Sequence, residues 1–284
     1  MTGLMAAALC VAAIGRRAAR RRFPTFAAAD GSAELRRNVL WSGLSYGSRV
    51  APALIDTGAS FSILPRGWLS NRSATQSKSI SSRFRRSVAS FFAIDVLEFG
   101  GRSLVNLQVT SGRSSYGLVG LDILLSRRLF RIGSRNVRLG SATRTIRHAI
   151  EVPIEIEHGA HSSDGVRALY LFIEIDGKVE KVHFDTGRPG VLEASALLPA
   201  PENRALGGIE FIGNPLGQSR FEPYFKRTAR LKIGKRSFTK DFRHYYRNSS
   251  SNTSYIMGAA IFEVFDIEID LDSERALFFP LSHQ

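Results

Sequence analysis

Cysteine is almost absent from this chain of 284 residues: the single one, Cys10, lies near the N-terminus. An intramolecular disulfide is therefore excluded, and a metal site or a nucleophile built on cysteine is not expected. The six histidines show no metal-ligand spacing such as H-E-x-x-H. No apolar run approaches the length of a membrane span. Composition therefore indicates a globular chain, and we expect neither a metal nor a cofactor.

Lysine is also scarce, since only 7 of the 39 basic residues are lysines. The charge is uneven: residues 1–150 carry 23 basic and 6 acidic side chains, whereas residues 151–284 carry 16 and 19. A basic half is typical of a solvated surface, and contact with an anionic surface or an acidic substrate is the alternative. No nucleic-acid motif accompanies the arginines, so a nucleic-acid partner is not expected.

The N-terminal segment differs from the rest of the chain. Residues 4–14 are apolar and rich in alanine, and a cluster of arginines follows them. A secretory signal carries its positive charge before the apolar stretch, so this order fits poorly. An organelle presequence, an export segment and a misplaced start codon all remain open. We assign residues 1–35 to a poorly ordered leader and leave the compartment unassigned.

The tripeptide Asp-Thr-Gly occurs twice, at Asp56 and at Asp185. An apolar run precedes each copy, and a paired-apolar-Gly step follows each, ending at Gly120 and at Gly258. The two spacings are similar, 64 and 73 residues. A short helix and a hairpin then close each half, so the chain reads as an internal duplication. Two carboxylates on equivalent turns suggest an acid/base dyad.

The pattern predicts an all-β protein, mainly antiparallel, with a few short helices. We expect the short helices at residues 121–129 and 259–265, and a hairpin turn at Asp176-Gly177. The predicted divisions are a first half over residues 36–145 and a second over residues 146–284. Each half is too small to bury an ample core alone, so the two are expected to pack together.

These motifs resemble the aspartic protease superfamily. The first half is close to retropepsin-like lobes at residues 53–60 and 117–124, and the second half keeps Asp-Thr-Gly and the step Ile256-Met257-Gly258. The resemblance implies a single-chain, bilobal, pepsin-like fold: two retropepsin-like β-barrel lobes with a cleft between them. It further implies a monomeric endopeptidase acting on polypeptide, with Asp56 and Asp185 as catalytic residues. The supporting residues would be Thr57, Gly58, Ala59, Gly120, Thr186, Gly187, Arg188 and Gly258.

Elementary chemistry gives each residue type a reason. Gly58 and Gly187 would let the turns adopt backbone angles that a side chain forbids. Thr57 and Thr186 can hydrogen-bond across a two-fold axis. Two adjacent carboxylates cannot both ionise, so they share a proton and can activate a water molecule. Residues 76–90 and 206–221 are the expected flaps over the site.

Arg188 departs from the family pattern, in which a small or hydroxyl residue follows Asp-Thr-Gly. Its guanidinium either lies beside the dyad, where it would lower the carboxyl pKa values, or turns away to an acid or to solvent. The activity prediction depends on this residue, and a weakened or inactive peptide-binding scaffold is the alternative function. Two further expectations are that Asp122 caps a helix and that His183 is packed inside the protein.

Overall fold

The computed structural model describes residues 23–81, 86–140, 148–158, 166–194, 198, 206–213, 216, 219–245 and 253–281. Of the predicted leader, residues 1–22 lie outside the described residues. Residues 23–35 are described, and they include a buried Ala29, a bridge from Ser32 to Asn136 and the start of strand β1 at Ala33, so this part is not a poorly ordered tail. Strands dominate the described chain, which confirms the all-β prediction. No helix in these ranges is long and apolar enough to cross a membrane.

The first repeat, as we call the chain from β1 to β10, forms an eight-stranded sheet and a closing hairpin. Its sheet order is β1-β2-β3-β8-β4-β7-β6-β5. The strands are β1 (Ala33–Arg36), β2 (Val39–Tyr46), β3 (Arg49–Ile55), β4 (Ile63–Leu64), β5 (Gln76–Ser81), β6 (Arg86–Phe99), β7 (Arg102–Ser111) and β8 (Gly117–Val119), then α2 (Leu121–Leu124), the 3-10 turn η1 (Leu125–Arg127), β9 (Leu129–Ile132) and β10 (Val137–Leu139).

The second repeat runs from β11 to β20, and its strands follow the same plan. They are β11 (Ile150–His158), β12 (Val166–Ile175), β13 (Lys178–Phe184), β14 (Leu192–Ala194), β15 (Leu206–Gly213), β16 (Ser219–Ile233), β17 (Arg236–Tyr245) and β18 (Tyr255–Met257), then the 3-10 helix η2 (Ala259–Glu263), β19 (Phe265–Asp270) and β20 (Arg275–Pro280).

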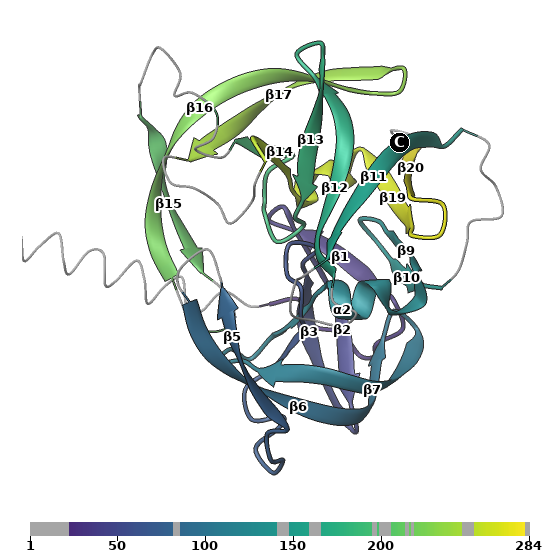
Figure 1. Ribbon diagram of the computed structural model, residues 1–284, viewed down its shortest axis with the longest axis vertical. Coiled ribbons are helices and arrows are strands. Elements are labelled where there is room, and N and C mark those ends of the chain that lie inside the picture. The colour runs from purple at the N-terminus through teal and green to yellow at the C-terminus, as the bar shows by residue number, and fades with distance from the viewer. Residues whose placement is uncertain are drawn as a thin grey trace, which may run out of the picture.

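The strand pairings of the two repeats correspond one to one. In the first, β3 pairs in parallel with β8, β8 antiparallel with β4, and β4 in parallel with β7. In the second, β13, β18, β14 and β17 repeat this sequence of directions. Contacts from β2 to β6 and from β12 to β16 then join the ends of six strands in each repeat. In Figure 1, β6 and β7 of the first repeat lie at the bottom, and β13, β16 and β17 of the second repeat lie at the top.

A shared sheet joins the repeats. Strand β9 of the first pairs antiparallel with β19 of the second, with Phe130 opposite Ile269 and Ile132 opposite Ile267. Strand β10 extends this sheet on one side, and β20 and β11 extend it on the other. These side chains are buried in one apolar cluster that draws residues from both repeats. The halves thus share a core, as the small size of each predicted.

Some local predictions need adjustment. The turn at Asp176-Gly177 is confirmed, because both residues have positive φ and Ile175 pairs with Lys178. The helices are shorter than expected: α2 ends at Leu124, where a 3-10 turn replaces it, and η2 is entirely 3-10. The predicted boundary at residues 145 and 146 lies outside the described residues.

Because the core is continuous, we expect the two repeats to unfold together. Both tryptophans, Trp41 and Trp68, lie in the first repeat, so their fluorescence reports that half while far-UV circular dichroism reports both. The two transitions should coincide in a denaturant titration. Ile269→Ala in the second repeat should lower the stability by about 2–5 kcal/mol and should shift the tryptophan transition equally. Two separate transitions would contradict the shared core.

Candidate active site

The two aspartates lie at equivalent strand ends. Asp56 follows β3 and Asp185 follows β13, and each main-chain N–H donates to the last residue of the adjacent parallel strand: to Val119 at 3.0 Å and to Met257 at 2.9 Å. Each carboxylate also accepts the N–H of the glycine two residues on, at 2.9 Å in Gly58 and 3.1 Å in Gly187. The parallel strand pair therefore fixes the direction of each carboxyl group.

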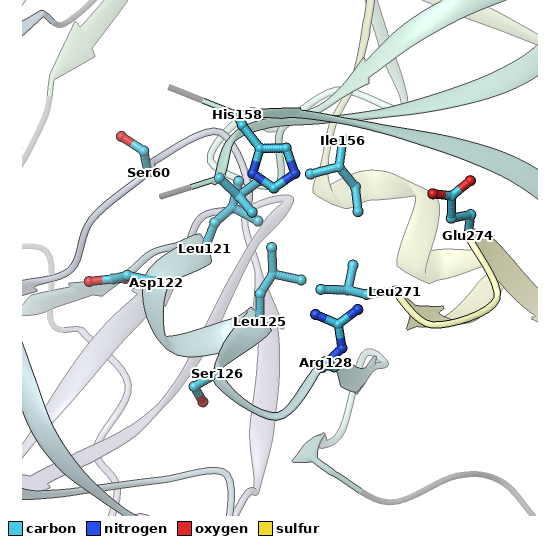
Figure 2. Close-up of a pocket in the computed structure, with 11 residues that line it drawn as sticks. Ser60, Leu121, Asp122, Leu125, Ser126, Arg128, Ile156, His158, Leu271 and Glu274 are labelled. Atoms are coloured by element: carbon cyan, nitrogen blue, oxygen red, sulfur yellow. The ribbon is translucent and has the colours of Figure 1, made fainter. Parts of the chain in front are cut away.

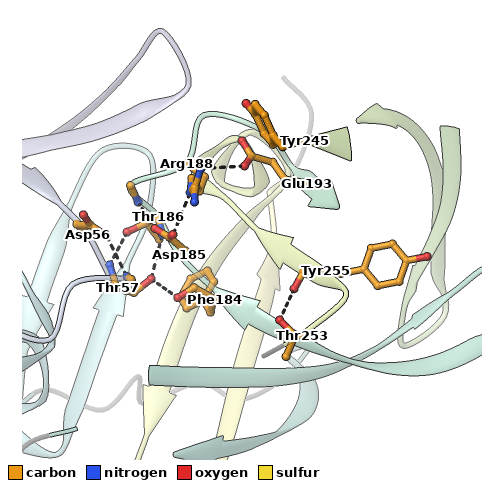
Figure 3. Close-up of polar contacts among 12 residues, drawn as sticks. Asp56, Thr57, Phe184, Asp185, Thr186, Arg188, Glu193, Tyr245, Thr253 and Tyr255 are labelled. Atoms are coloured by element: carbon orange, nitrogen blue, oxygen red, sulfur yellow. Dashed lines mark hydrogen bonds and ion pairs between the residues drawn. The ribbon is translucent and has the colours of Figure 1, made fainter. Parts of the chain in front are cut away.

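Thr57 and Thr186 bind the two loops to each other (Figure 3). Each hydroxyl accepts the main-chain N–H of the other threonine at 3.0 Å. Each also donates across the interface at 2.7 Å, Thr57 to the carbonyl of Phe184 and Thr186 to the carbonyl of Ile55. Both side chains are fully buried. Four crossed hydrogen bonds thus hold the residues on both sides of each aspartate.

The carboxyl groups of the two aspartates lie close enough to interact with each other. Each also lies against the glycine of the opposite loop: a Cβ on Gly58 would fall 2.3 Å from Cγ of Asp185, and one on Gly187 would fall 2.7 Å from Cγ of Asp56. Neither glycine has positive φ. The predicted reason for these glycines, unusual backbone angles, is therefore wrong, because what requires them is space for the partner's carboxylate.

Gly120 and Gly258 occupy matching places beneath the loops. A Cβ on Gly120 would lie 2.7 Å from the carbonyl oxygens of Ala59 and Phe61, and one on Gly258 would lie 2.4 Å from that of Arg188. The next residue in each repeat hydrogen-bonds the loop, Leu121 to Ala59 at 2.8 Å and Ala259 to Arg188 at 2.7 Å. A second strand therefore ends in close contact with the aspartate loop in both repeats, and the glycine leaves the space for it.

Burial raises the pKa of both aspartates. For Asp56 the removal of water is the largest cause, and the neighbouring Asp185 carboxyl adds to it. For Asp185 the loss of water again dominates, and the negative charge of Glu193 raises the pKa further. The side chain of Asp185 nevertheless keeps 13% of its surface exposed. The pair can therefore hold a shared proton and still meet a solvent molecule.

Arg188 lies beside the dyad. Its Nε donates to Oδ2 of Asp185 at 3.1 Å, and its Nη1 lies 3.4 Å from Oε2 of Glu193. Only 11% of the side chain is exposed. The sequence left two positions open for this arginine, beside the dyad or turned away to pair with an acid. The structure combines them, because Arg188 contacts Asp185 of the dyad and also pairs with Glu193. Its charge lowers the pKa of Asp56, but burial outweighs that effect.

Sequence reasoning missed Glu193. It lies on β14, where all three residues are buried, and its side chain is 1% exposed. The available signal was an acid inside the short apolar run Val191-Leu192-Glu193-Ala194. The surrounding β15 and β17 carry Glu210, Arg243 and Tyr245, in which Glu210 accepts hydrogen bonds from both others at 2.5–2.9 Å. The second repeat thus has a charged interior next to Asp185.

The two predicted flaps are β-hairpins, β5–β6 and β15–β16. The tip of the first, residues 82–85, lies outside the described residues. Leu216, between β15 and β16, packs against a small cluster of Ile80, Ala89 and Phe91 from the first hairpin. Phe61, five residues after Asp56, joins that cluster. The two hairpins therefore contact each other across the repeats.

Asp122 has a different role from the one expected. The N-cap of α2 is Gly120, and no side chain caps the helix. Instead, Asp122 accepts hydrogen bonds from the hydroxyl and the N–H of Ser62, at 2.6 Å and 2.9 Å. It also lines a cavity of about 530 Å³ between the repeats, beside Arg128 and His158 (Figure 2). Neither Asp56 nor Asp185 lines this cavity.

His183 is packed inside, as predicted. It is 7% exposed, its ring centroid lies 5.5 Å from that of Tyr170, and burial lowers its pKa to about 4. A neutral imidazole at this position adds no charge to the dyad at neutral pH. Among the described residues, no group of three or more histidine, cysteine or acidic side chains could hold a metal ion.

No protein-family model matches the sequence, and no curated protein matches it.

The crossed threonines should carry much of the stability of this site. Thr57→Val keeps the side-chain shape but leaves the N–H of Thr186 and the carbonyl of Phe184 without partners. We expect a loss of about 2–4 kcal/mol in the free energy of unfolding. Thr57→Ser retains the hydroxyl and should lose about 1 kcal/mol or less. Equal losses for the two variants in denaturant titration would show that the hydroxyl is not responsible.

The raised pKa values predict a pH dependence of stability. Between the pKa of an unfolded aspartate, about 4, and the raised pKa of the dyad, the folded protein binds more protons than the unfolded chain. Its stability from this pair must therefore fall as the pH rises through that window. Asp56→Asn removes the effect and should raise the melting temperature at pH 7 but not at pH 3.5. Asp95→Asn, at an exposed acid, is the control and should give no such difference.

Proposed function

We propose that this protein is an aspartic-type endopeptidase, in which two retropepsin-like lobes in one chain form a bilobal, pepsin-like fold. The matching order of strand pairings in the two repeats supports the fold. The observation that carries the function is the close approach of the Asp56 and Asp185 carboxyl groups, each lying against the glycine of the opposite loop, on loops held by the crossed threonines. The substrate would be polypeptide, and no metal or cofactor takes part in the proposal.

The proposed chemistry uses the pair as one acid and one base. The ionised carboxylate takes a proton from a water molecule, whose oxygen forms a bond to the scissile carbonyl carbon. The protonated carboxyl gives its proton to the carbonyl oxygen. When the tetrahedral diol collapses, the C–N bond breaks, the amide nitrogen receives the proton that the base had taken, and one diol hydroxyl gives its proton to the other carboxylate as the product carbonyl forms. Each carboxyl has then acted once as an acid and once as a base, and the pair again holds a single shared proton.

An extended polypeptide fits the surroundings of the pair. Extended chains bind by adding hydrogen bonds to strands, with side chains alternating between pockets. The β5–β6 and β15–β16 hairpins supply such strands on either side and meet at Leu216. Substrate entry would separate Leu216 from Phe61 and Phe91, so we expect the hairpins to open and close during turnover.

A peptide-binding protein without catalysis is the second candidate. The ion pair from Arg188 to Asp185 favours it, because a cation on one carboxylate opposes the shared-proton state. A catalytic dyad would cleave substrate, whereas a scaffold would retain it intact.

Proteolysis assays distinguish the two candidates. Unfolded polypeptides, one acidic and one basic, are incubated with the protein from pH 3 to pH 8, and new termini are identified by mass spectrometry. Asp56→Asn and Asp185→Asn should each lower cleavage by about 10²–10⁴-fold, whereas Asp95→Asn on exposed β6 should leave it unchanged. Cleavage that survives both dyad substitutions would remove the proposal. Binding without cleavage at every pH would support the scaffold.

A further inference from the structure

Arg188 and Glu193 form one connected pair beside the dyad. The guanidinium bridges Asp185 and Glu193, and the side chains of all three residues are at most 13% exposed. The main chain of Arg188 is also fixed, since its N–H donates to Asp185 at 3.0 Å and its carbonyl accepts from Ala259 at 2.7 Å. Figure 3 shows the arginine between the two acids. The guanidinium is therefore held in place and is not a mobile surface charge.

The first repeat shows what the fold needs at these two places. Arg188 and Ala59 are each the third residue after the aspartate of their repeat. The carbonyl of Arg188 accepts a hydrogen bond from Ala259, which follows Gly258, and the carbonyl of Ala59 accepts one from Leu121, which follows Gly120. On the next strand, Glu193 lies opposite Ile256, as Ile63 lies opposite Leu118. Alanine and isoleucine therefore satisfy the fold in one repeat. The second repeat carries both charges at once.

The two charges act on the dyad in opposite directions. A guanidinium on Asp185 favours the ionised carboxylate, whereas a buried glutamate beside it favours the protonated form. Neither carboxyl oxygen of Glu193 has a hydrogen-bond partner among the described residues, and its carboxylate instead forms an ion pair with Arg188. Glu193 is thus positioned to offset the charge of Arg188.

Other charged or titratable groups face this pair from the neighbouring strands. Asp56 approaches from the first repeat, with His183 of β13 near it, while Glu210 lies on β15, Glu222 on β16, and Arg243 and Tyr245 on β17. Glu210 accepts hydrogen bonds from Arg243 and Tyr245, and Glu222 pairs with Arg220. Burial raises the pKa of Glu193, and the charges of Arg188 and Arg243 both oppose that rise. Of these two cations, Arg188 is the one that forms the ion pair with Glu193.

We propose that Glu193 is a positioning residue, which holds Arg188 and offsets its charge so that the Asp56–Asp185 pair keeps its shared proton. The inference rests on the proposed function and adds its regulation: the Arg188–Glu193 pair sets the pH range in which the dyad can catalyse hydrolysis. Arg188 lowers the proton affinity of the dyad, and Glu193 restores it.

The test compares three variants by the pH profile of kcat/KM. Glu193→Gln leaves Arg188 uncompensated, so the alkaline limb should move to lower pH by about one unit, a tenfold change in proton affinity. Arg188→Ala should move the limb to higher pH. The double variant Arg188→Ala/Glu193→Gln should return close to the original profile. Glu268→Gln, at a buried acid on β19, is the control and should not shift it.

A merely structural pair would lower the melting temperature of the single variants without moving the profile, and that result would overturn the inference. If Glu193→Gln does not fold, the shift of Arg188→Ala and its reversal in the double variant decide the question. The carboxyl resonances of Asp56 and Asp185 give a readout that needs no activity: ¹³C NMR titration should show the same opposite shifts. Cleavage with unmoved titrations would sink this inference alone, whereas absent cleavage with moved titrations would sink the proposed function alone.

Discussion

The contact between two buried carboxyl groups is the constraint on which the rest of this structure depends. Two carboxyl groups that lie against each other in a site with little water cannot both be ionised. The loops must therefore bring the groups together without allowing them to separate, and the crossed bonds of Thr57 and Thr186 do this through fully buried hydroxyls. Gly58 and Gly187 follow from the same requirement, because any side chain there would occupy the place of the opposite carboxylate.

The shared sheet extends this constraint to the whole molecule. Because β9 pairs with β19, the repeats cannot rotate against each other without breaking a ladder that is buried on its apolar face. The threonine bonds join the two loops, and the shared sheet adds a continuous apolar core between the two repeats. A small shift of one repeat against the other would therefore change the contact between the carboxyl groups directly. The single apolar cluster that spans both repeats opposes such a shift.

The sequence predicted much of this organisation because its two halves repeat the same motifs and can be compared with each other. The paired Asp-Thr-Gly and the downstream glycines predicted the strand ends at Asp56 and Asp185, and the Asp176-Gly177 turn followed from its own chemistry. The lengths of α2 and η2 could not be predicted, since packing and not propensity ends such short helices. Glu193 was missed for a related reason: an acid in an apolar strand has meaning only when its neighbour in space, Arg188, is known.

The repeats differ where symmetry would be expected to matter most. A symmetric dyad with an alanine beside each aspartate would give the two carboxyl groups equal surroundings. The arginine of the second repeat breaks that equality by binding only Asp185, and Glu193 lies on its far side with the opposite charge. Burying two opposite charges together costs less free energy than burying one of them alone. The Arg188–Glu193 pair can therefore remain beside the dyad while its net electrostatic effect on the dyad stays small. The asymmetry then lies in the donors: both carboxyl groups accept a glycine N–H, but Asp185 also accepts the guanidinium N–H of Arg188.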